Sequence, residues 1–167
     1  MKTKLLIIFS ILFASQVFAK ELTIRCDISS LGSIELYRYI DKIWGSKVQH
    51  KLDGDWMDIE EAIERENDNY ANAMVILKKF TNKDVYNYFQ KNIEVEVKDM
   101  GVLVKQFIQL DKSKRAQLNL SDEREAKIFS KKNTTYIDFE IPSIKFINHT
   151  NPNYNYYHEC RQIKHGE

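Results

Sequence analysis

Residues 22–28 read LTIRCDI, and this short segment carries the strongest fold signal in the chain. Its apolar residues alternate with polar ones: Leu22, Ile24, Cys26 and Ile28 share one side. Strict alternation is typical of a β-strand with one buried face. The segment therefore predicts a strand that points Cys26 into the core.

The only other cysteine, Cys160, lies near the opposite end in YNYYHEC (residues 154–160). Tyr154, Tyr156, His158 and Cys160 again share one parity, which predicts a last strand. Two cysteines in an exported protein usually pair, and only one pairing exists here. We predict a Cys26–Cys160 disulfide between neighbouring terminal strands. In the chain-entropy model, closing a loop of more than about 100 residues stabilises a fold by about 4–5 kcal/mol. Two free buried thiols, or a reactive Cys160, are the alternative.

The expectation of export comes from residues 1–19. Lys2 and Lys4 precede an apolar run over 5–13, and Val17 and Ala19 suit a signal-peptidase site. The run is shorter than the roughly 20 residues of a membrane span. We expect a signal peptide over 1–19, followed by one periplasmic or secreted domain over 20–167 with no membrane span. An N-terminal anchor helix is the alternative.

Most of the chain between the cysteines also reads as strands. The segments expected to be strands lie at 33–40, 46–59, 70–80, 92–99, 101–111, 115–120, 134–141 and 143–147. The Asp53-Gly54 pair predicts a tight hairpin turn. Residues 112–114 (Lys-Ser-Lys) predict a turn between two paired strands. Pro142 predicts an edge strand or a bend.

Three segments have helical signals instead. Residues 58–66 place Ile59, Ala62 and Ile63 at helical spacing after an acidic turn; 82–91 and 121–131 carry weaker patterns. The fold class is therefore all-β and mainly antiparallel. We expect a small barrel or two-layer sandwich of about eight strands, with one or two short helices.

Composition and motifs exclude several functions. The net charge of +1 becomes −1 without Lys2 and Lys4, too balanced for a general nucleic-acid binder. The four histidines form no zinc-protease motif, and His158 is expected to be a packed or rim residue. The acidic run at 53–61 reads as a turn and helix start in preference to a cation site. The sequence predicts no catalytic residue, metal or cofactor.

The candidate binding surface is aromatic. Tyrosines with nearby amides suit stacking on sugars or anchoring of partners, although they are also ordinary strand residues. The candidates are Tyr154, Tyr156, Tyr157, Tyr37, Tyr39 and Trp44.

Two functions remain open. The first is a non-enzymatic binding or interaction domain for a protein, a glycan or a small apolar ligand. The second is an exported hydrolase, which requires two carboxylates converging in a cleft, at least one with a raised pKa.

Overall fold

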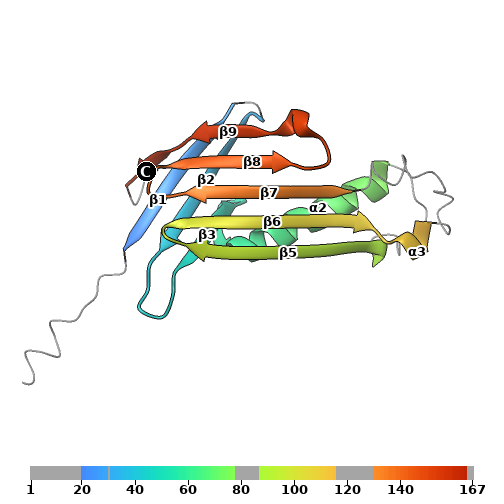
Figure 1. Cartoon of the computed structure of the whole chain (residues 1–167), viewed down its shortest axis with the longest axis horizontal. Coiled ribbons are helices and arrows are strands. Elements are labelled where there is room, and N and C mark those ends of the chain that lie inside the picture. Colours follow the sequence, from blue (N-terminus) through green and yellow to red (C-terminus); the bar gives the residue numbers. More distant parts are fainter. Residues whose placement is uncertain (1–19, 30, 78–86, 116–129, 165–167) are drawn as a thin grey trace, which may run out of the picture.

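The first predicted strand is confirmed in the computed structural model, which describes residues 20–29, 31–77, 87–115 and 130–164. The last is confirmed in part, because Tyr154 lies in a short 3₁₀ helix, η3 (Pro152–Tyr154), and the strand begins at Tyr156. Every pair of neighbouring strands is antiparallel. The first sheet has the order β10-β1-β2-β3-β4 and the second β5-β6-β7-β8-β9 (Figure 1). The strands are β1 (Glu21–Ile28), β2 (Ser33–Ile40), β3 (Lys47–Leu52), β4 (Asp55–Asp58), β5 (Phe89–Lys98), β6 (Gly101–Leu110), β7 (Lys131–Asp138), β8 (Ser143–Asn148), β9 (Tyr156–Glu159) and β10 (Arg161–Ile163).

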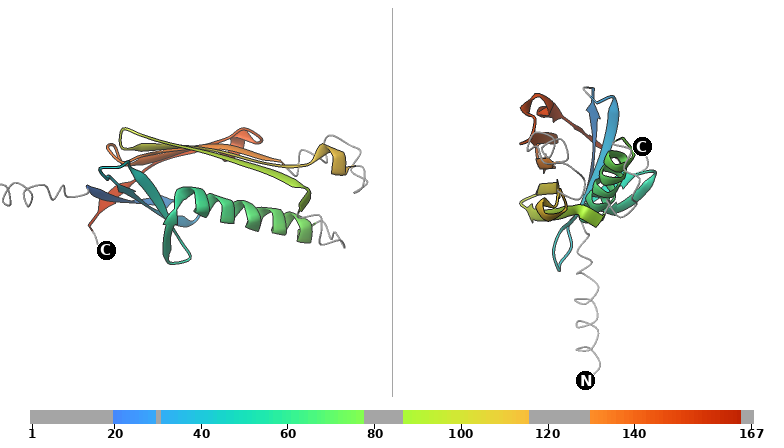
Figure 2. Two further views of the ribbon diagram at one scale, coloured as in Figure 1. Left: turned by 90° about the horizontal axis from the view of Figure 1, so that it is seen from below. Right: turned by 90° about the vertical axis from the view of Figure 1, so that its right-hand side faces the viewer.

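Two sheets with a helix alongside form a sandwich, and the barrel alternative is wrong. The strands of the first sheet run obliquely behind those of the second (Figure 1). A closed barrel would need β4 to pair with β5, but these two edge strands belong to different sheets. The helix α2 (Ile59–Leu77) connects them and contacts β3, β4 and β5 (Figure 2). The edge strands β4 and β5 therefore do not pair, and the sandwich is open between them.

The chain crosses from the second sheet to the first at Cys160. Strand β9 ends at Glu159 beside β8, and β10 begins at Arg161 beside β1. Cys160 bonds to Cys26 of β1, with a sequence separation of 134 residues. The predicted disulfide between neighbouring terminal strands is confirmed. It fastens the two sheets at the corner where they meet.

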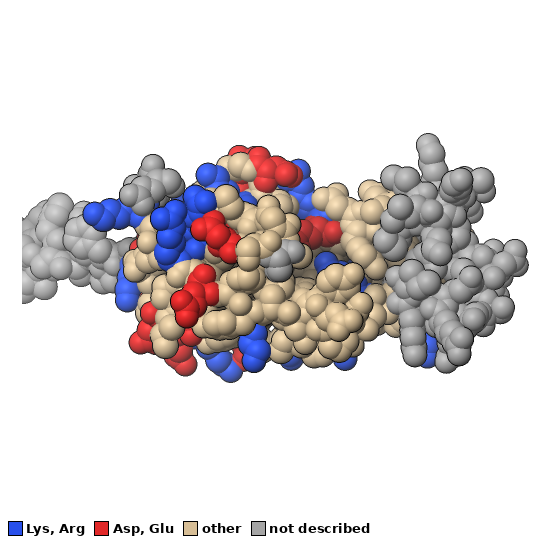
Figure 3. Space-filling model, turned by 90° about the horizontal axis from the view of Figure 1, so that it is seen from above, with Lys and Arg blue, Asp and Glu red and all other residues tan. Residues whose placement is uncertain are grey.

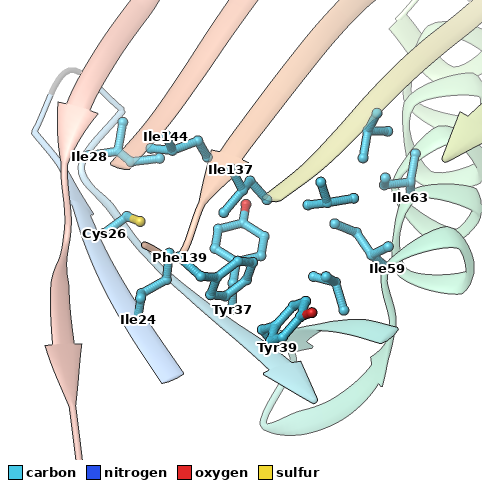
Figure 4. Close-up of a cluster of buried hydrophobic side chains, with 13 residues drawn as sticks. Ile24, Cys26, Ile28, Tyr37, Tyr39, Ile59, Ile63, Ile137, Phe139 and Ile144 are labelled. Atoms are coloured by element: carbon cyan, nitrogen blue, oxygen red, sulfur yellow. The ribbon is translucent and has the colours of Figure 1, made fainter. Parts of the chain in front are cut away.

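The core lies between the sheets at this corner. Ile24, Cys26 and Ile28 are at most 1% exposed and face residues of the second sheet (Figure 4). The opposing side chains are Ile137, Phe139 and Ile144. The alternation in β1 thus predicted the correct buried face.

Turn chemistry joins several of the strands as expected. Asp53 (φ 53°) and Gly54 (φ 95°) form the β3–β4 hairpin in the left-handed region that such turns require. Pro142 lies in the connection between β7 and β8, outside both strands. The acidic run ends in the β4 strand and the first turn of α2, where Glu60 and Glu61 lie.

Residues 70–80 were expected to form a strand, and this expectation is wrong for 70–77. They continue α2, which is 19 residues long. The buried positions Ile59, Ile63, Asn67 and Ala71 recur every four residues, whereas Ala73 is exposed. The sequence pattern does not show this buried face, because Asn67 places a polar side chain at one of the core positions.

Two other expectations were also partly wrong. A helix over 82–91 conflicts with β5, because Phe89 is already paired with Leu110. The Lys-Ser-Lys turn is a short helix, α3 (Lys112–Arg115), and β6 pairs with β5 and β7 instead of a strand over 115–120. Residues 78–86 and 116–129, which hold the rest of these predictions and most of the 121–131 helix, lie outside the described residues, as do residues 1–19.

Candidate functional site

A pocket of about 520 Å³ lies between the two sheets and beside α2. This volume falls in the range of small-molecule sites, roughly 300–1,000 Å³. Its apolar wall consists of Ile59, Ile63, Val104, Ile137, Ile144 and Phe146. Its polar and aromatic wall includes Glu35, Tyr37, His50, Glu66, Tyr70, Gln106, Lys131, Asn133, Thr135 and Tyr156.

Secondary-structure periodicity explains why these side chains converge. Lys131, Asn133, Thr135 and Ile137 alternate along β7 and face one side of the sheet. On α2 the lining residues Ile59, Ile63, Glu66 and Tyr70 recur at helical spacing along one stripe. The inter-sheet face of each element therefore supplies the pocket wall.

On the face seen from above, the charged side chains are distributed unevenly along the molecule. In Figure 3, most basic and acidic side chains of this face gather over the part near the N-terminal trace. The middle of the face is formed mainly by other residues.

The polar centre of the pocket is the pair Glu35–His50. His50 is 3% exposed, and its Nε2 lies 2.7 Å from Glu35 Oε2. The imidazole stacks on the Tyr37 ring, with ring centroids 4.6 Å apart. The hydrogen bond from His50 lowers the pKa of Glu35, which therefore acts as an acceptor only. Nε2 must then carry the proton and donate to Glu35.

Glu66 approaches the other side of the same imidazole. Its Oε1 lies 4.0 Å from His50 Nδ1, which is longer than a hydrogen bond. Its side chain is 40% exposed, yet the loss of hydration among the pocket residues raises its pKa. Two carboxylates in one pocket are thus shifted in opposite directions, which is common at functional sites.

Two tyrosines, Tyr37 and Tyr156, line the same pocket as the Glu35–His50 pair. Burial raises the pKa of Tyr156 to about 12, and the nearby Glu35 and Glu66 charges add to the effect. Burial and the same carboxylates also raise the pKa of Tyr37. Tyr156 stacks on Phe146 with ring centroids 4.9 Å apart. Both hydroxyls stay protonated at neutral pH and can donate hydrogen bonds to a ligand.

Lys131 places a positive charge in the pocket. Its Nζ lies 5.6 Å from the centre of the Tyr70 ring, within cation–π reach. Burial lowers the pKa of Lys131, and the charge of Glu66 opposes this effect. Among the described residues, no salt bridge at 4.0 Å or less joins Lys131 to Glu66.

A chain of three buried amides runs from α2 into the pocket wall. Gln106 Nε2 donates to Asn67 Oδ1 at 2.7 Å, and Asn133 Nδ2 donates to Gln106 Oε1 at 3.3 Å. Asn133 is 1% exposed, and its Oδ1, like Asn67 Nδ2 at the other end of the chain of amides, is buried without a hydrogen-bond partner among the described residues. The two hydrogen bonds join α2 to β6 and β7.

The aromatic candidates from the sequence are distributed over three environments. Tyr37, Tyr154 and Tyr156 line the pocket. Tyr39 lies in the core at 5% exposure and donates to Ser46 Oγ, so it is not a surface residue. Trp44 and Tyr157 are 96% and 58% exposed and do not line the pocket.

Sequence reasoning missed the charged centre of the site. Glu35, His50, Glu66 and Lys131 come from four elements, and no spacing along the chain connects them. A signal was present in β2 and β3. Glu35 shares the inward face of β2 with Ser33, Tyr37 and Tyr39, and His50 shares that of β3 with Val48 and Leu52. An ionisable residue at such a position indicates either a paired structural group or a functional site.

The described residues contain no cluster of three or more His, Cys, Asp or Glu side chains arranged to hold a metal ion. No described helix has the length and hydropathy needed to cross a membrane. No protein-family model, curated protein or solved structure matches this chain.

Proposed function

We propose that this protein is exported and binds a small amphipathic molecule in the pocket between its two sheets. The observation that carries the proposal is the pocket itself, with an apolar wall facing convergent polar side chains. Small-molecule sites have this composition and volume. A ligand would bury its apolar body against Ile63, Ile137 and Ile144, and meet the Glu35–His50 centre with its polar end.

The disulfide and the N-terminal sequence support export. A disulfide is typical of a protein that folds in an oxidising compartment. The basic and apolar pattern of residues 1–19 is that of a signal peptide. Export would bring the domain into contact with molecules of the periplasm or the surroundings.

Hydrolysis is the second candidate, favoured by one specific observation. Glu35 and Glu66 reach the same pocket, and the pKa of Glu66 is raised while that of Glu35 is lowered. A carboxyl group with a raised pKa beside one with a lowered pKa is the arrangement that sugar hydrolysis uses. Binding remains the better supported proposal because it requires only the pocket.

A pocket-filling substitution tests the binding function. We expect Nile red, an uncharged apolar dye, to bind the wild-type protein and brighten. Thr135→Trp places a large ring in the pocket and should weaken dye binding by about tenfold or more, a loss of about 1.4 kcal/mol. Fluorescence titration measures the affinity, and circular dichroism verifies that each variant is folded.

Lys132→Trp is the matched control for this test. Lys132 belongs to the same strand but has the opposite parity and is exposed. Its replacement should leave dye affinity unchanged. Thr135→Leu, a smaller filling residue, should give an intermediate loss. Equal affinities in Thr135→Trp and wild type would contradict binding in the pocket.

A further inference from the structure

The ligand's polar end can be specified from the groups that the pocket leaves unsatisfied. Glu66 Oε1 lies 4.0 Å from His50 Nδ1, which is beyond hydrogen-bond distance. Among the described residues, no hydrogen bond reaches the Glu66 carboxylate, although Glu66 lines the pocket. This carboxylate can therefore accept hydrogen bonds from a ligand.

The surroundings of Glu66 suit a positively charged partner. An ammonium donates charge-assisted hydrogen bonds to a carboxylate. The rings of Tyr37, Tyr70 and Tyr156 also line the pocket, and aromatic faces attract cations.

A ligand with only a positive charge would not explain why Lys131 also lines the pocket. The half-buried Lys131 side chain lines the same pocket, and the charges of Lys131 and Glu66 each shift the pKa of the other group. The two nevertheless form no salt bridge at 4.0 Å or less. A protein that only needed to neutralise Glu66 could do so by direct contact with Lys131. Their separation leaves one negative and one positive group available to the same ligand.

We infer that the pocket takes a zwitterion with an apolar body, of the kind represented by an apolar α-amino acid. Its ammonium donates to Glu66, and its carboxylate accepts from Lys131. Its apolar part lies against Ile59, Ile63 and Ile137. This inference rests on the proposed binding function and adds the charge pattern of the ligand.

Three related compounds separate the two charges. L-Phenylalanine carries both, phenethylamine lacks the carboxylate, and phenylpropionate lacks the ammonium. Calorimetric titration and displacement of Nile red measure their affinities for the protein without the proposed signal peptide, residues 20–167. We expect phenylalanine to bind at least about tenfold more tightly than either analogue, because charge-assisted hydrogen bonds are stronger than neutral ones.

Substitutions in the pocket assign each charge. Glu66→Gln should weaken phenylalanine binding about tenfold and leave phenylpropionate binding unchanged. Lys131→Met should weaken phenylalanine binding similarly and leave phenethylamine binding unchanged. The unchanged analogue in each variant demonstrates that the pocket is still folded. Glu64→Gln and Lys132→Met, at exposed positions of the same elements, are the controls and should behave as wild type.

The outcomes distinguish this inference from the proposed function. If Nile red binds in the pocket but either analogue binds as tightly as phenylalanine, or none of the three displaces the dye, the zwitterion inference is wrong and the binding function stands. If Glu66→Gln and Glu64→Gln have equal effects, Glu66 does not hold the ligand. If the dye itself does not enter the pocket, the proposed function fails first.

Discussion

Removing the Cys26–Cys160 disulfide should lower the free energy of unfolding by about 5 kcal/mol. The bond closes a loop with a sequence separation of 134 residues, and the chain-entropy model assigns a large gain to a loop of this length. It also joins β1 to the point where the chain crosses between sheets. Urea unfolding of the Cys26→Ala/Cys160→Ala variant, compared with wild type, measures the loss.

The reduced wild-type protein is the control for this prediction. A reducing agent should destabilise the wild type by a similar amount and leave the double variant unaffected. A loss below about 1 kcal/mol, within the scatter of ordinary surface substitutions, would contradict the role given to the disulfide.

Removing His50 should have the second largest effect. The Glu35 side chain is 25% exposed. His50→Leu removes the imidazole nitrogen that lies 2.7 Å from its carboxylate and leaves this carboxylate without that partner. Breaking a buried pair from one side costs about 3–5 kcal/mol, whereas replacing both members is often neutral. We expect His50→Leu to lower the free energy of unfolding by about 3 kcal/mol. His50→Leu/Glu35→Met should recover most of the loss, and urea unfolding measures both.

The same pair predicts a dependence on pH. The pKa of Glu35 in the folded protein is below its ordinary value of 4.5, so folding is favoured while this carboxylate is ionised. The contribution is present above pH 4.5 and is lost as the pH falls through the folded-state value. The stability difference between wild type and Glu35→Gln should therefore shrink in acid. A difference that stays constant from neutral pH to about pH 3 would contradict the pairing.

The sequence predicted the sheet faces well because alternation is a local property. In β1, and in β5 from Ile93 to Val97, each apolar residue is separated from the next by one polar residue. Burial follows that order except at Thr23, which is 8% exposed. The disulfide was predictable because only one pairing exists. Neither inference required knowledge of which strands lie side by side.

Helix α2 was only half predicted because its second half breaks the usual pattern. Asn67 occupies a buried position, and its amide is satisfied by Gln106 from β6. This partner lies 39 residues away, so the sequence gives no sign that an asparagine can be buried there. Asparagine also has a lower helix propensity than alanine or leucine, and the run ENDNYANA contains three of them.

The pocket could not be predicted because it depends on how far the sheets separate. Glu35 and His50 lie in the first sheet, Glu66 in α2 and Lys131 in the second sheet. Glu66 and Lys131 are ordinary residues of their own segments, and the inward positions of Glu35 and His50 do not reveal which groups they meet. Only the arrangement of the two sheets around α2 makes them neighbours. The barrel alternative failed for the same reason, since strand patterns do not reveal whether the edge strands meet.

Isoleucine methyl groups offer the most direct test that ligands bind between the sheets. Ile59, Ile63, Ile137 and Ile144 line the pocket, whereas Ile34, Ile43 and Ile141 are 57%, 68% and 70% exposed and do not. Methyl-labelled protein titrated with Nile red should show resonance shifts in the first group and none in the second. Shifts confined to the exposed group would place binding on the outer surface and contradict the pocket.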